Sequence, residues 1–219
     1  MSKVAMIPAR IGSQRLKQKN LRQINGKSLV QIAIEKCKKA NCFDEIWVNS
    51  ENDEILDIAE KNEAKSYKRK SVLADSISTS EDFIFDFLKN VRCSHLIQVH
   101  TIAPLLDYHE VKDFTSSFIK SNADVYLAGI EEQIECIYQK NPINFSFSEK
   151  TNSQDLLPIM RITWSITGWK SSSFLEARKT KGFGTYNGKI EIHPVSKISG
   201  HVVKDEKDLE IASILYDQI

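Results

Sequence analysis

Four cationic side chains follow the first apolar run of the chain within ten positions. They are Arg10, Arg15, Lys17 and Lys19. The run itself, Val4–Ile7, predicts a buried strand that ends at Pro8, and Gly12 lets the backbone beyond it come close to a ligand. Because cations this close repel one another unless an anion or solvent separates them, the cluster favours a triphosphate, and a solvated basic turn is the alternative. The stretch is neither a Walker loop nor a GxGxxG motif.

Strand and helix patterns alternate along the rest of the chain, which predicts an α/β layer structure. Further strands are expected at 45–49, 65–67, 95–100 and 124–128. Helices are expected over 28–40, from Asn52 or Asp53, from the Ser78–Glu81 segment, over 110–120, and from Asp205 or Glu206 to the end. The alternating apolar residues of 155–169 follow a polar and aromatic segment, and 182–188 is expected to be a flexible loop.

Length and charge restrict the class of protein. The 219 residues suffice for one substantial core, so we expect a single domain over 1–219. A formal net charge of +1 gives no overall field that would gather nucleic acid or an acidic membrane, and neither partner is expected. The four cysteines lack CxxC spacing and are expected to be reduced thiols, and no signal peptide or apolar span is present. These features predict a cytoplasmic protein.

The basic stretch belongs to a longer ordered motif. It runs Ile7-Pro8-Ala9-Arg10-x-Gly12-Ser13-x-Arg15-Leu16-x-x-Lys19-Asn20-Leu21, followed by Gly26-Lys27-Ser28-Leu29. This motif closely resembles the opening signature of the sugar-acid cytidylyltransferases, which make CMP-sialic (CMP-N-acylneuraminate), CMP-pseudaminic, CMP-legionaminic and CMP-Kdo sugars. The resemblance implies the three-layer α/β/α nucleotide-diphospho-sugar transferase fold, Rossmann-like with a mixed sheet. It also implies a strand-rich dimerisation arm, at about 131–168, and hence a homodimer.

The resemblance assigns roles to individual residues. In the family this loop wraps the phosphates of CTP, so the expected nucleotide-binding positions here are Ala9, Arg10, Gly12, Ser13, Arg15, Lys19 and Asn20, with Arg10 and Lys19 also catalytic. Arg69 begins a block similar to the family's Arg-Pro-x-x-Leu-Ala, whose arginine lies near the nucleotide. Ser80 falls where the family has a hydroxyl pair, and it is either a helix cap or a nucleotide ligand.

Two further residues are expected to bind the sugar acid. Gln154-Asp155-Leu156-x-Pro158 resembles the family's Arg-Gln-Asp-Leu-Pro segment, which makes Gln154 a substrate-binding candidate. Arg161 lies where an arginine could hold the substrate carboxylate, because a guanidinium fork pairs with a carboxylate bidentately. An ordinary salt bridge of Arg161 is the alternative.

The chain departs from the family pattern at three places. His100 replaces a glutamine that faces the nucleotide, and a neutral imidazole makes fewer hydrogen bonds than an amide. Trp164 stands where the family has glycine, so it fills space near the sugar acid. Val202 and Lys204 occupy the positions of the family's Asp-x-Asp, whose carboxylates hold Mg²⁺. The resemblance still implies Mg²⁺ as cofactor, with Asp205, one residue away, as the candidate ligand.

The expected activity is transfer of CMP from CTP to a nonulosonic or related sugar acid, with release of pyrophosphate. Such transfers depend mainly on positioning and on charge neutralisation at the phosphates. The missing Asp-x-Asp motivates an alternative, a degenerate homologue that binds nucleotide or sugar acid without catalysis.

Overall fold

A seven-stranded mixed sheet forms the centre of the computed structural model, which describes residues 1–75 and 77–217. The strand order is β11-β7-β10-β6-β1-β4-β5, and only β10 runs antiparallel to its neighbours. The strands are β1 (Lys3–Pro8), β4 (Glu45–Ser50), β5 (Lys65–Lys68), β6 (His95–Val99), β7 (Val125–Glu132), β10 (Ile159–Lys170) and β11 (Ile190–Pro194). Two short hairpins add β2 (Gln23–Ile24) with β3 (Lys27–Ser28), and β8 (Ile137–Tyr138) with β9 (Asn141–Pro142).

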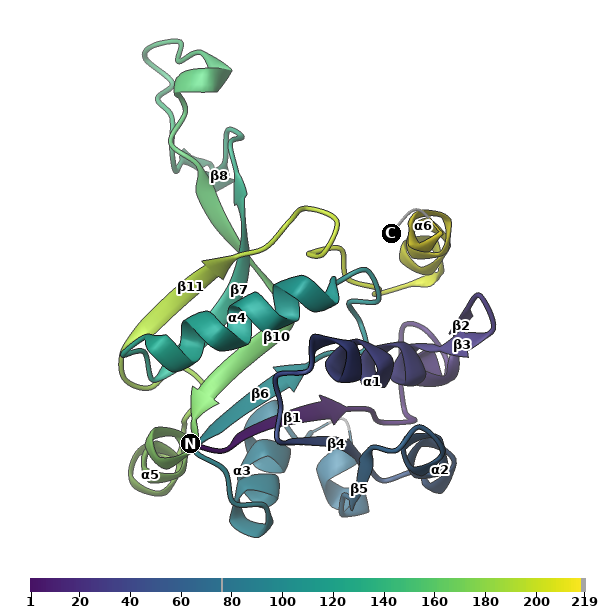
Figure 1. Ribbon diagram of the computed structural model, residues 1–219. Helices are drawn as coiled ribbons and strands as arrows, with labels where there is room; N and C mark the ends of the chain where they lie inside the picture. Colours follow the sequence, from purple (N-terminus) through teal and green to yellow (C-terminus); the bar gives the residue numbers. More distant parts are fainter. Residues whose placement is uncertain (76, 218–219) are drawn as a thin grey trace.

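Helices cover both faces of this sheet (Figure 1). The α-helices are α1 (Leu29–Ala40), α2 (Asp53–Lys61), α3 (Ser80–Asn90), α4 (Tyr108–Lys120), α5 (Ser171–Lys181) and α6 (Glu206–Tyr216). Short 3₁₀ turns lie at Lys19–Leu21, Ser71–Ala74 and Ser153–Asp155. Side chains of α1, α2 and α4 share one core cluster, those of α3 and α5 share a second, and the start of α1 shares a third with α6. The predicted three-layer α/β/α fold with a mixed sheet is therefore confirmed.

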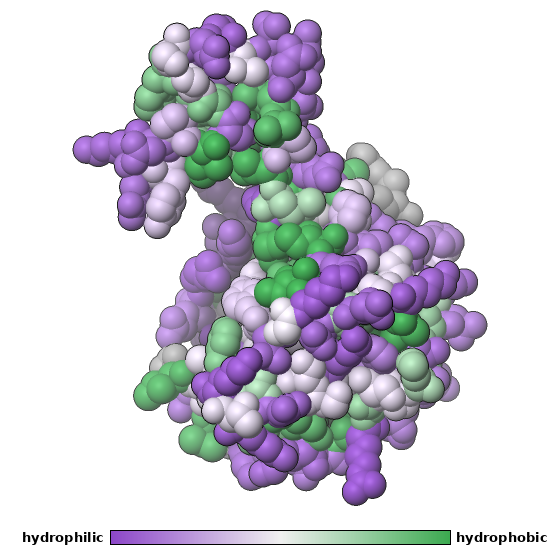
Figure 2. Space-filling view, turned by 90° about the vertical axis from the view of Figure 1, so that its left-hand side faces the viewer, coloured by the Kyte–Doolittle hydropathy of each residue, from purple (hydrophilic) through white to green (hydrophobic). Residues whose placement is uncertain are grey.

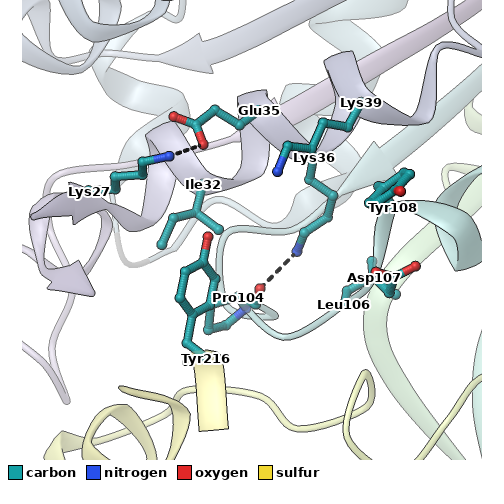
Figure 3. A pocket seen from close by; sticks show the side chains of 10 residues that line it. All are labelled: Lys27, Ile32, Glu35, Lys36, Lys39, Pro104, Leu106, Asp107, Tyr108 and Tyr216. Atoms are coloured by element: carbon teal, nitrogen blue, oxygen red, sulfur yellow. Dashed lines mark hydrogen bonds and ion pairs between the residues drawn. The ribbon is translucent and has the colours of Figure 1, made fainter. Parts of the chain in front are cut away.

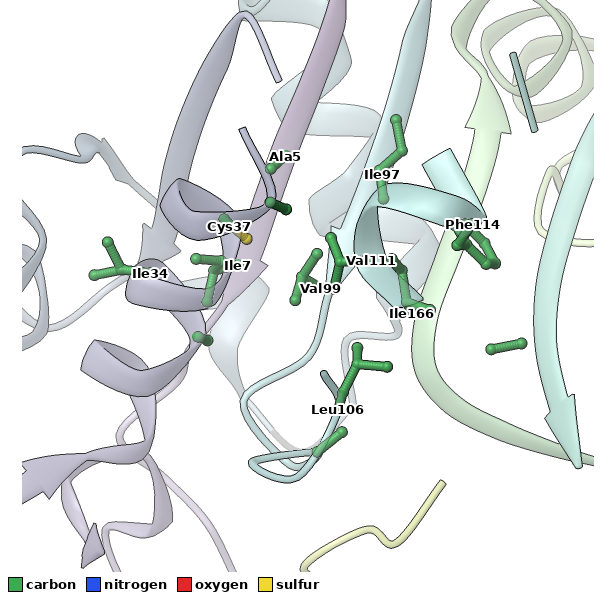
Figure 4. Packing of buried hydrophobic residues seen from close by; sticks show 14 of the residues in the cluster. Ala5, Ile7, Ile34, Cys37, Ile97, Val99, Leu106, Val111, Phe114 and Ile166 are labelled. Carbon is green, nitrogen blue, oxygen red and sulfur yellow. The ribbon is translucent and has the colours of Figure 1, made fainter. Parts of the chain in front are cut away.

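The larger core cluster lies under α1 and α4 (Figure 4). Alternate residues of β1 and β6, such as Ile7 and Val99, point to this face and contact apolar residues of the two helices. Phe114 of α4 is fully buried in it. On the opposite face, Trp169 of β10 packs edge-on against Phe174 of α5, with 5.8 Å between ring centroids. Within the described part of the chain, no helix is long and apolar enough to cross a membrane.

The helix starts follow local capping chemistry, which the sequence largely predicted. Ser28 caps α1, where its hydroxyl accepts from the Gln31 amide at 3.2 Å, and Asn52 caps α2 through the Ile55 amide at 3.1 Å. Asp205 caps α6. The structure adds α5, which we did not predict, because its polar sequence lacks a clear apolar stripe and only Phe174 and Ala177 among its apolar residues are fully buried.

A segment of residues 133–158 projects from the sheet between β7 and β10; we call it the arm (Figure 1). The expected arm, 131–168, also included 131–132 and 159–168, which belong to the sheet strands β7 and β10. Of these, Ile166–Lys170 of β10 also pairs with β6. The arm carries large apolar side chains that are at least half exposed, and Figure 2 shows hydrophobic groups on its surface. They are Ile134, Ile137, Tyr138, Ile143, Phe147 and Leu157.

Candidate nucleotide-binding site

A cavity of about 320 Å³ opens at the carboxyl ends of the parallel strands β1 and β6. This edge of an open α/β sheet is the usual place for a ligand, because the loops that follow neighbouring strands meet there. The lining residues are Pro8, Arg10, Ser13, Gln14, Arg15, Lys19, Asn20, Arg69, Phe83, His100, Thr101 and Ile102. Four of them are cations, and no carboxylate stands among the described residues of this lining. The cavity is therefore suited to an anion.

The loop after β1 is held by hydrogen bonds to three residues of other segments, Asn49, Glu51 and Asp75. The Ala9 amide donates to the Asn49 carbonyl at 3.0 Å, and the Ile11 amide donates to Glu51 Oε1 at 2.8 Å. Arg10 Nη1 donates to the Asp75 carbonyl at 2.8 Å. Ala9 is fully buried and does not line the cavity, so its amide serves the sheet. A side chain at Gly12 would meet no atom within 4 Å, so this glycine is not required by packing.

Asn20 braces this loop against the loop after β6. Its Nδ2 donates to the Arg10 carbonyl at 2.7 Å, and its Oδ1 accepts from the Thr101 hydroxyl at 2.6 Å. The side chain is 6% exposed. Its amide therefore fixes the distance between the two loops, a positioning role that the motif alone did not reveal.

Lys19 lies close to the positive charges of Arg10 and Arg15. Its Nζ donates to the Val203 carbonyl at 3.1 Å, ahead of α6. Burial lowers the pKa of Lys19, and the nearby Arg15 and Arg10 lower it further, while Asp208 opposes them. An anion bound between these cations would relieve their mutual repulsion, so the electrostatics of the cavity favour phosphate groups.

Arg69 is a buried cation at the back of the cavity. It is 3% exposed, its Nε donates to Asn49 Oδ1 at 2.6 Å, and its Nη2 donates to the Asn49 carbonyl at 2.8 Å. The guanidinium lies over the Phe83 ring, 4.2 Å from its centroid. Burial lowers the pKa of Arg69 to about 10, so it stays charged at neutral pH. Two of its five N–H groups are used by Asn49, which leaves donors for a ligand.

His100 presents a neutral imidazole to the cavity. Burial, helped by the charge of Lys19, lowers the pKa of His100 to about 4. Its Nε2 is buried and finds no hydrogen-bond partner in the described residues. The buried Gln98 Nε2 and Thr167 Oγ1, which sit opposite each other on β6 and β10, lack partners in the same way. Unsatisfied buried groups are costly, so His100 Nε2 indicates a polar ligand or water in the cavity, whereas Gln98 and Thr167 do not line it.

Comparison with known proteins agrees with this geometry. The family model described as cytidylyltransferase matches residues 4–204. The chain belongs to the cytidylyltransferase family. A pseudaminic acid cytidylyltransferase of Campylobacter jejuni is 30% identical over 169 residues, covering 71% of this chain and 73% of the relative. A CMP-N,N'-diacetyllegionaminic acid synthase of Legionella pneumophila is 37% identical over 89 residues, 38% of each chain.

Among solved structures, a CMP-Kdo synthetase in complex with CTP superposes with a TM-score of 0.76 over 100% of this chain and 99% of its own. At 16% identity this likeness shows the fold alone. Cytidylyltransferases are nucleotidyltransferases, so the chain belongs to the class of enzyme that the sequence motif predicted.

The cavity gathers most of the residues that the motif predicted for the nucleotide. Arg10, Ser13, Arg15 and Lys19 line it with Asn20, Arg69 and His100. The sequence analysis did not single out Gln14, Phe83, Thr101 and Ile102, which line it too. Phe83 belongs to the apolar pattern of α3 and gave no signal of its own. Thr101 and Ile102 directly follow His100, so the turn after a buried strand was the available signal.

Ser80 lies in a neighbouring cavity of about 410 Å³ rather than in the cation-lined one. It is the first residue of α3, exposed, and Thr79 before it is the cap. Trp164 lines the same cavity and packs near Tyr186, with 6.1 Å between ring centroids. Trp164 has a φ of 56°, where β10 shifts register against β7. That backbone conformation is strained for a bulky residue and readily adopted by glycine.

The two residues expected to hold the sugar acid lie away from the cation-lined cavity. Arg161 Nε donates to Glu132 Oε1 at 2.8 Å in a cross-strand salt bridge, which is the alternative that the sequence left open. Gln154 is exposed in the arm, where its carbonyl accepts from Gln133 Nε2 at 2.8 Å. Their roles toward a sugar acid stay predictions.

The side chains that line the cavity do not fit a magnesium ion held by the protein. Hard cations need oxygen ligands, and the described lining offers no carboxylate. No group of three or more His, Cys, Asp or Glu suited to a metal occurs within residues 1–75 and 77–217. Asp205 Oδ1 accepts from the Asp208 amide at 3.1 Å in a capping box, so its carboxylate caps α6. The metal role of Asp205 stays a prediction.

Replacing this cap separates the two roles of Asp205. Asp205→Ala should lower the free energy of unfolding by about 0.5–2 kcal/mol, because the first turn of α6 loses its acceptor. Asp205→Asn should leave it almost unchanged, since asparagine caps equally well. Urea unfolding measures both. If Asp205 is instead a metal ligand, Asp205→Asn would abolish Mg²⁺-dependent turnover while stability stays constant.

Proposed function

We propose that this cytidylyltransferase transfers CMP from CTP to the anomeric hydroxyl of a nonulosonic or related sugar acid. The hydroxyl oxygen bonds to the α-phosphorus, the bond from that phosphorus to the bridging oxygen breaks, and pyrophosphate leaves with that oxygen. The proton of the hydroxyl passes to solvent or to a base that the geometry does not single out. The observation that carries the proposal is the cavity whose described lining combines four cations with no carboxylate.

Individual residues supply the chemistry that such a transfer needs. Arg10, Arg15 and Lys19 converge on the space that the phosphates would occupy, and preorganised cations there stabilise charge that shifts toward the leaving pyrophosphate. Buried Arg69 adds a further fixed charge. His100, kept neutral, offers Nε2 as one hydrogen-bonding atom for the base of the nucleotide. These residues bind, orient and neutralise.

The test is pyrophosphate release from a panel of CTP, UTP, ATP and GTP, each with pseudaminic, legionaminic, N-acetylneuraminic and Kdo acids, with and without Mg²⁺. The proposal expects release with CTP and at least one of the nine-carbon acids. The relatives from Campylobacter jejuni and Legionella pneumophila, named for pseudaminic and diacetyllegionaminic acids, make these two the first to try. Release only with another nucleotide would contradict the assignment of CTP.

A second candidate is nucleotide binding without turnover. The lack of a carboxylate in the described lining favours it, because Mg²⁺ on a triphosphate is commonly held by one or two protein carboxylates. This candidate expects CTP binding by calorimetry together with no pyrophosphate from any acid in the panel. Magnesium, which the resemblance implies, enters that panel as a variable.

The arm predicts a homodimer. Its six apolar side chains, each 51–75% exposed, would be costly in water unless a partner covers them. Light scattering at micromolar concentration should give twice the mass of the chain. Charged substitutions at the two most exposed positions, Phe147→Glu with Leu157→Glu, should give the monomer mass with an unchanged circular dichroism spectrum. A monomeric wild-type protein would contradict the prediction.

A further inference from the structure

A second cavity, of about 310 Å³, lies on the α1 side of the molecule (Figure 3). It is bounded by α1, by the loop from β6 to α4, and by Tyr216 at the end of α6. Lys27 and Glu35 form an ion pair at its rim, with 2.6 Å between Nζ and Oε2. Lys36 enters it from α1 and is 6% exposed, which is unusual for a lysine.

The ammonium group of Lys36 is held by the backbone of one loop. Its Nζ donates to the Ala103 carbonyl at 2.6 Å and to the Pro104 carbonyl at 3.3 Å. Its described surroundings include no carboxylate within salt-bridge distance, and the nearby Asp107 uses Oδ1 to accept from the His109 amide at the start of α4. Burial accordingly lowers the pKa of Lys36 to about 7. The carbonyls of Ala103 and Pro104 therefore satisfy the hydrogen-bonding needs of the buried Lys36 amino group.

The same loop forms one wall of the nucleotide cavity. The Ala103 amide donates to the His100 carbonyl at 3.3 Å, so the turn that Lys36 fixes starts at His100. Thr101 is tied to Asn20, and the Ile102 carbonyl accepts from the Val203 amide at 2.7 Å. Val203 in turn receives the hydrogen bond of Lys19. Lys36 thus contacts the loop on the side of the second cavity. His100, Thr101 and Ile102, at the start of the same loop, line the cation-lined cavity, which we call the nucleotide cavity.

We propose that Lys36 is a positioning residue for the nucleotide cavity, and that it acts by fixing the turn from His100 to Pro104. The proposal rests on the proposed binding of CTP. Without Lys36, the Pro104 carbonyl would lose its side-chain donor, and the Ala103 carbonyl would keep only the Leu106 amide at 3.2 Å. The under-satisfied turn would then shift to reach water. The wall formed by His100, Thr101 and Ile102 would then lose its fixed place, and with it the contacts to the nucleotide.

The test compares Lys36→Met with Lys39→Met. Methionine keeps much of the aliphatic stem and removes the donor, and Lys39 lines the same cavity from an exposed position on α1. We expect Lys36→Met to raise the Kd and the KM for CTP about tenfold, about 1.4 kcal/mol, with kcat and the KM for the sugar acid within about twofold. Lys39→Met should match the wild type in all four. Lys36→Gln, which keeps a buried amide donor, should fall between them, and it replaces Lys36→Met if that variant does not fold.

The outcomes are distinguishable. A lower melting temperature of the Lys36 variants with unchanged CTP affinity would show a purely structural role and overturn the inference alone. A wild-type protein that binds no CTP would overturn the proposed function, and the inference with it. An equal rise in the KM for both substrates would also contradict a role confined to the nucleotide wall.

Discussion

Lys19→Met is expected to weaken CTP binding by about 1.5–3 kcal/mol, or roughly 10- to 150-fold in Kd. The ammonium lines the cavity together with Arg10 and Arg15, whose charges act on it, and it donates to the Val203 carbonyl at 3.1 Å. A charge-assisted hydrogen bond to a phosphate would be lost with it. Calorimetry with CTP measures the effect.

Lys17→Met is the matched control for this prediction. Lys17 belongs to the same loop but is exposed and does not line the cavity, so its loss should change Kd by less than about twofold. The melting temperatures of both variants check that the loop keeps its fold. Equal CTP affinity of Lys19→Met and the wild type would mean that this loop is not the phosphate-binding element.

His100 is expected to make the protein less stable as the pH falls from about 6.5 to about 4. Above that window the imidazole is neutral in both the folded and the unfolded state. Within it, the unfolded state takes up a proton near its ordinary pKa, while the folded state does so only at about 4. The unfolded state therefore binds more protons, and acidification should lower the free energy of unfolding by about 3 kcal/mol from this residue.

His100→Gln isolates this contribution, because glutamine does not titrate and is the residue that the family motif carries. Urea unfolding of both proteins between pH 7 and pH 4 gives the difference in free energy of unfolding. Between pH 7 and pH 4 the wild type should lose about 3 kcal/mol more of its free energy of unfolding than the variant does. Burial also lowers the pKa of His95 and His193, but these residues are common to both proteins and cancel. Parallel stability curves would show that His100 titrates normally.

Features set by neighbouring residues could be predicted from the sequence. A continuous apolar run located β1, and apolar residues at helical spacing located α1. The polar residues Ser28, Asn52 and Asp205 marked helix starts, because capping joins residues only a few positions apart. The basic motif after β1 indicated the family and located the cations Arg10, Arg15 and Lys19 that line the cavity. Here the chemistry lies within one short stretch of chain.

Features that depend on which distant segments meet were decided by the tertiary structure alone. Lys19 and Val203 are 184 positions apart, and Lys36 and Ala103 are 67 apart, yet each pair shares a hydrogen bond. Arg161 found Glu132 because β10 runs antiparallel to β7, a pairing that no local pattern specifies. The order of strands in the sheet and the packing of its helices determine which of these distant residues come into contact. The sequence by itself therefore determined most of the elements, the cationic loop after β1 and the family, while packing of the layers decided which polar groups are satisfied and which remain for a ligand.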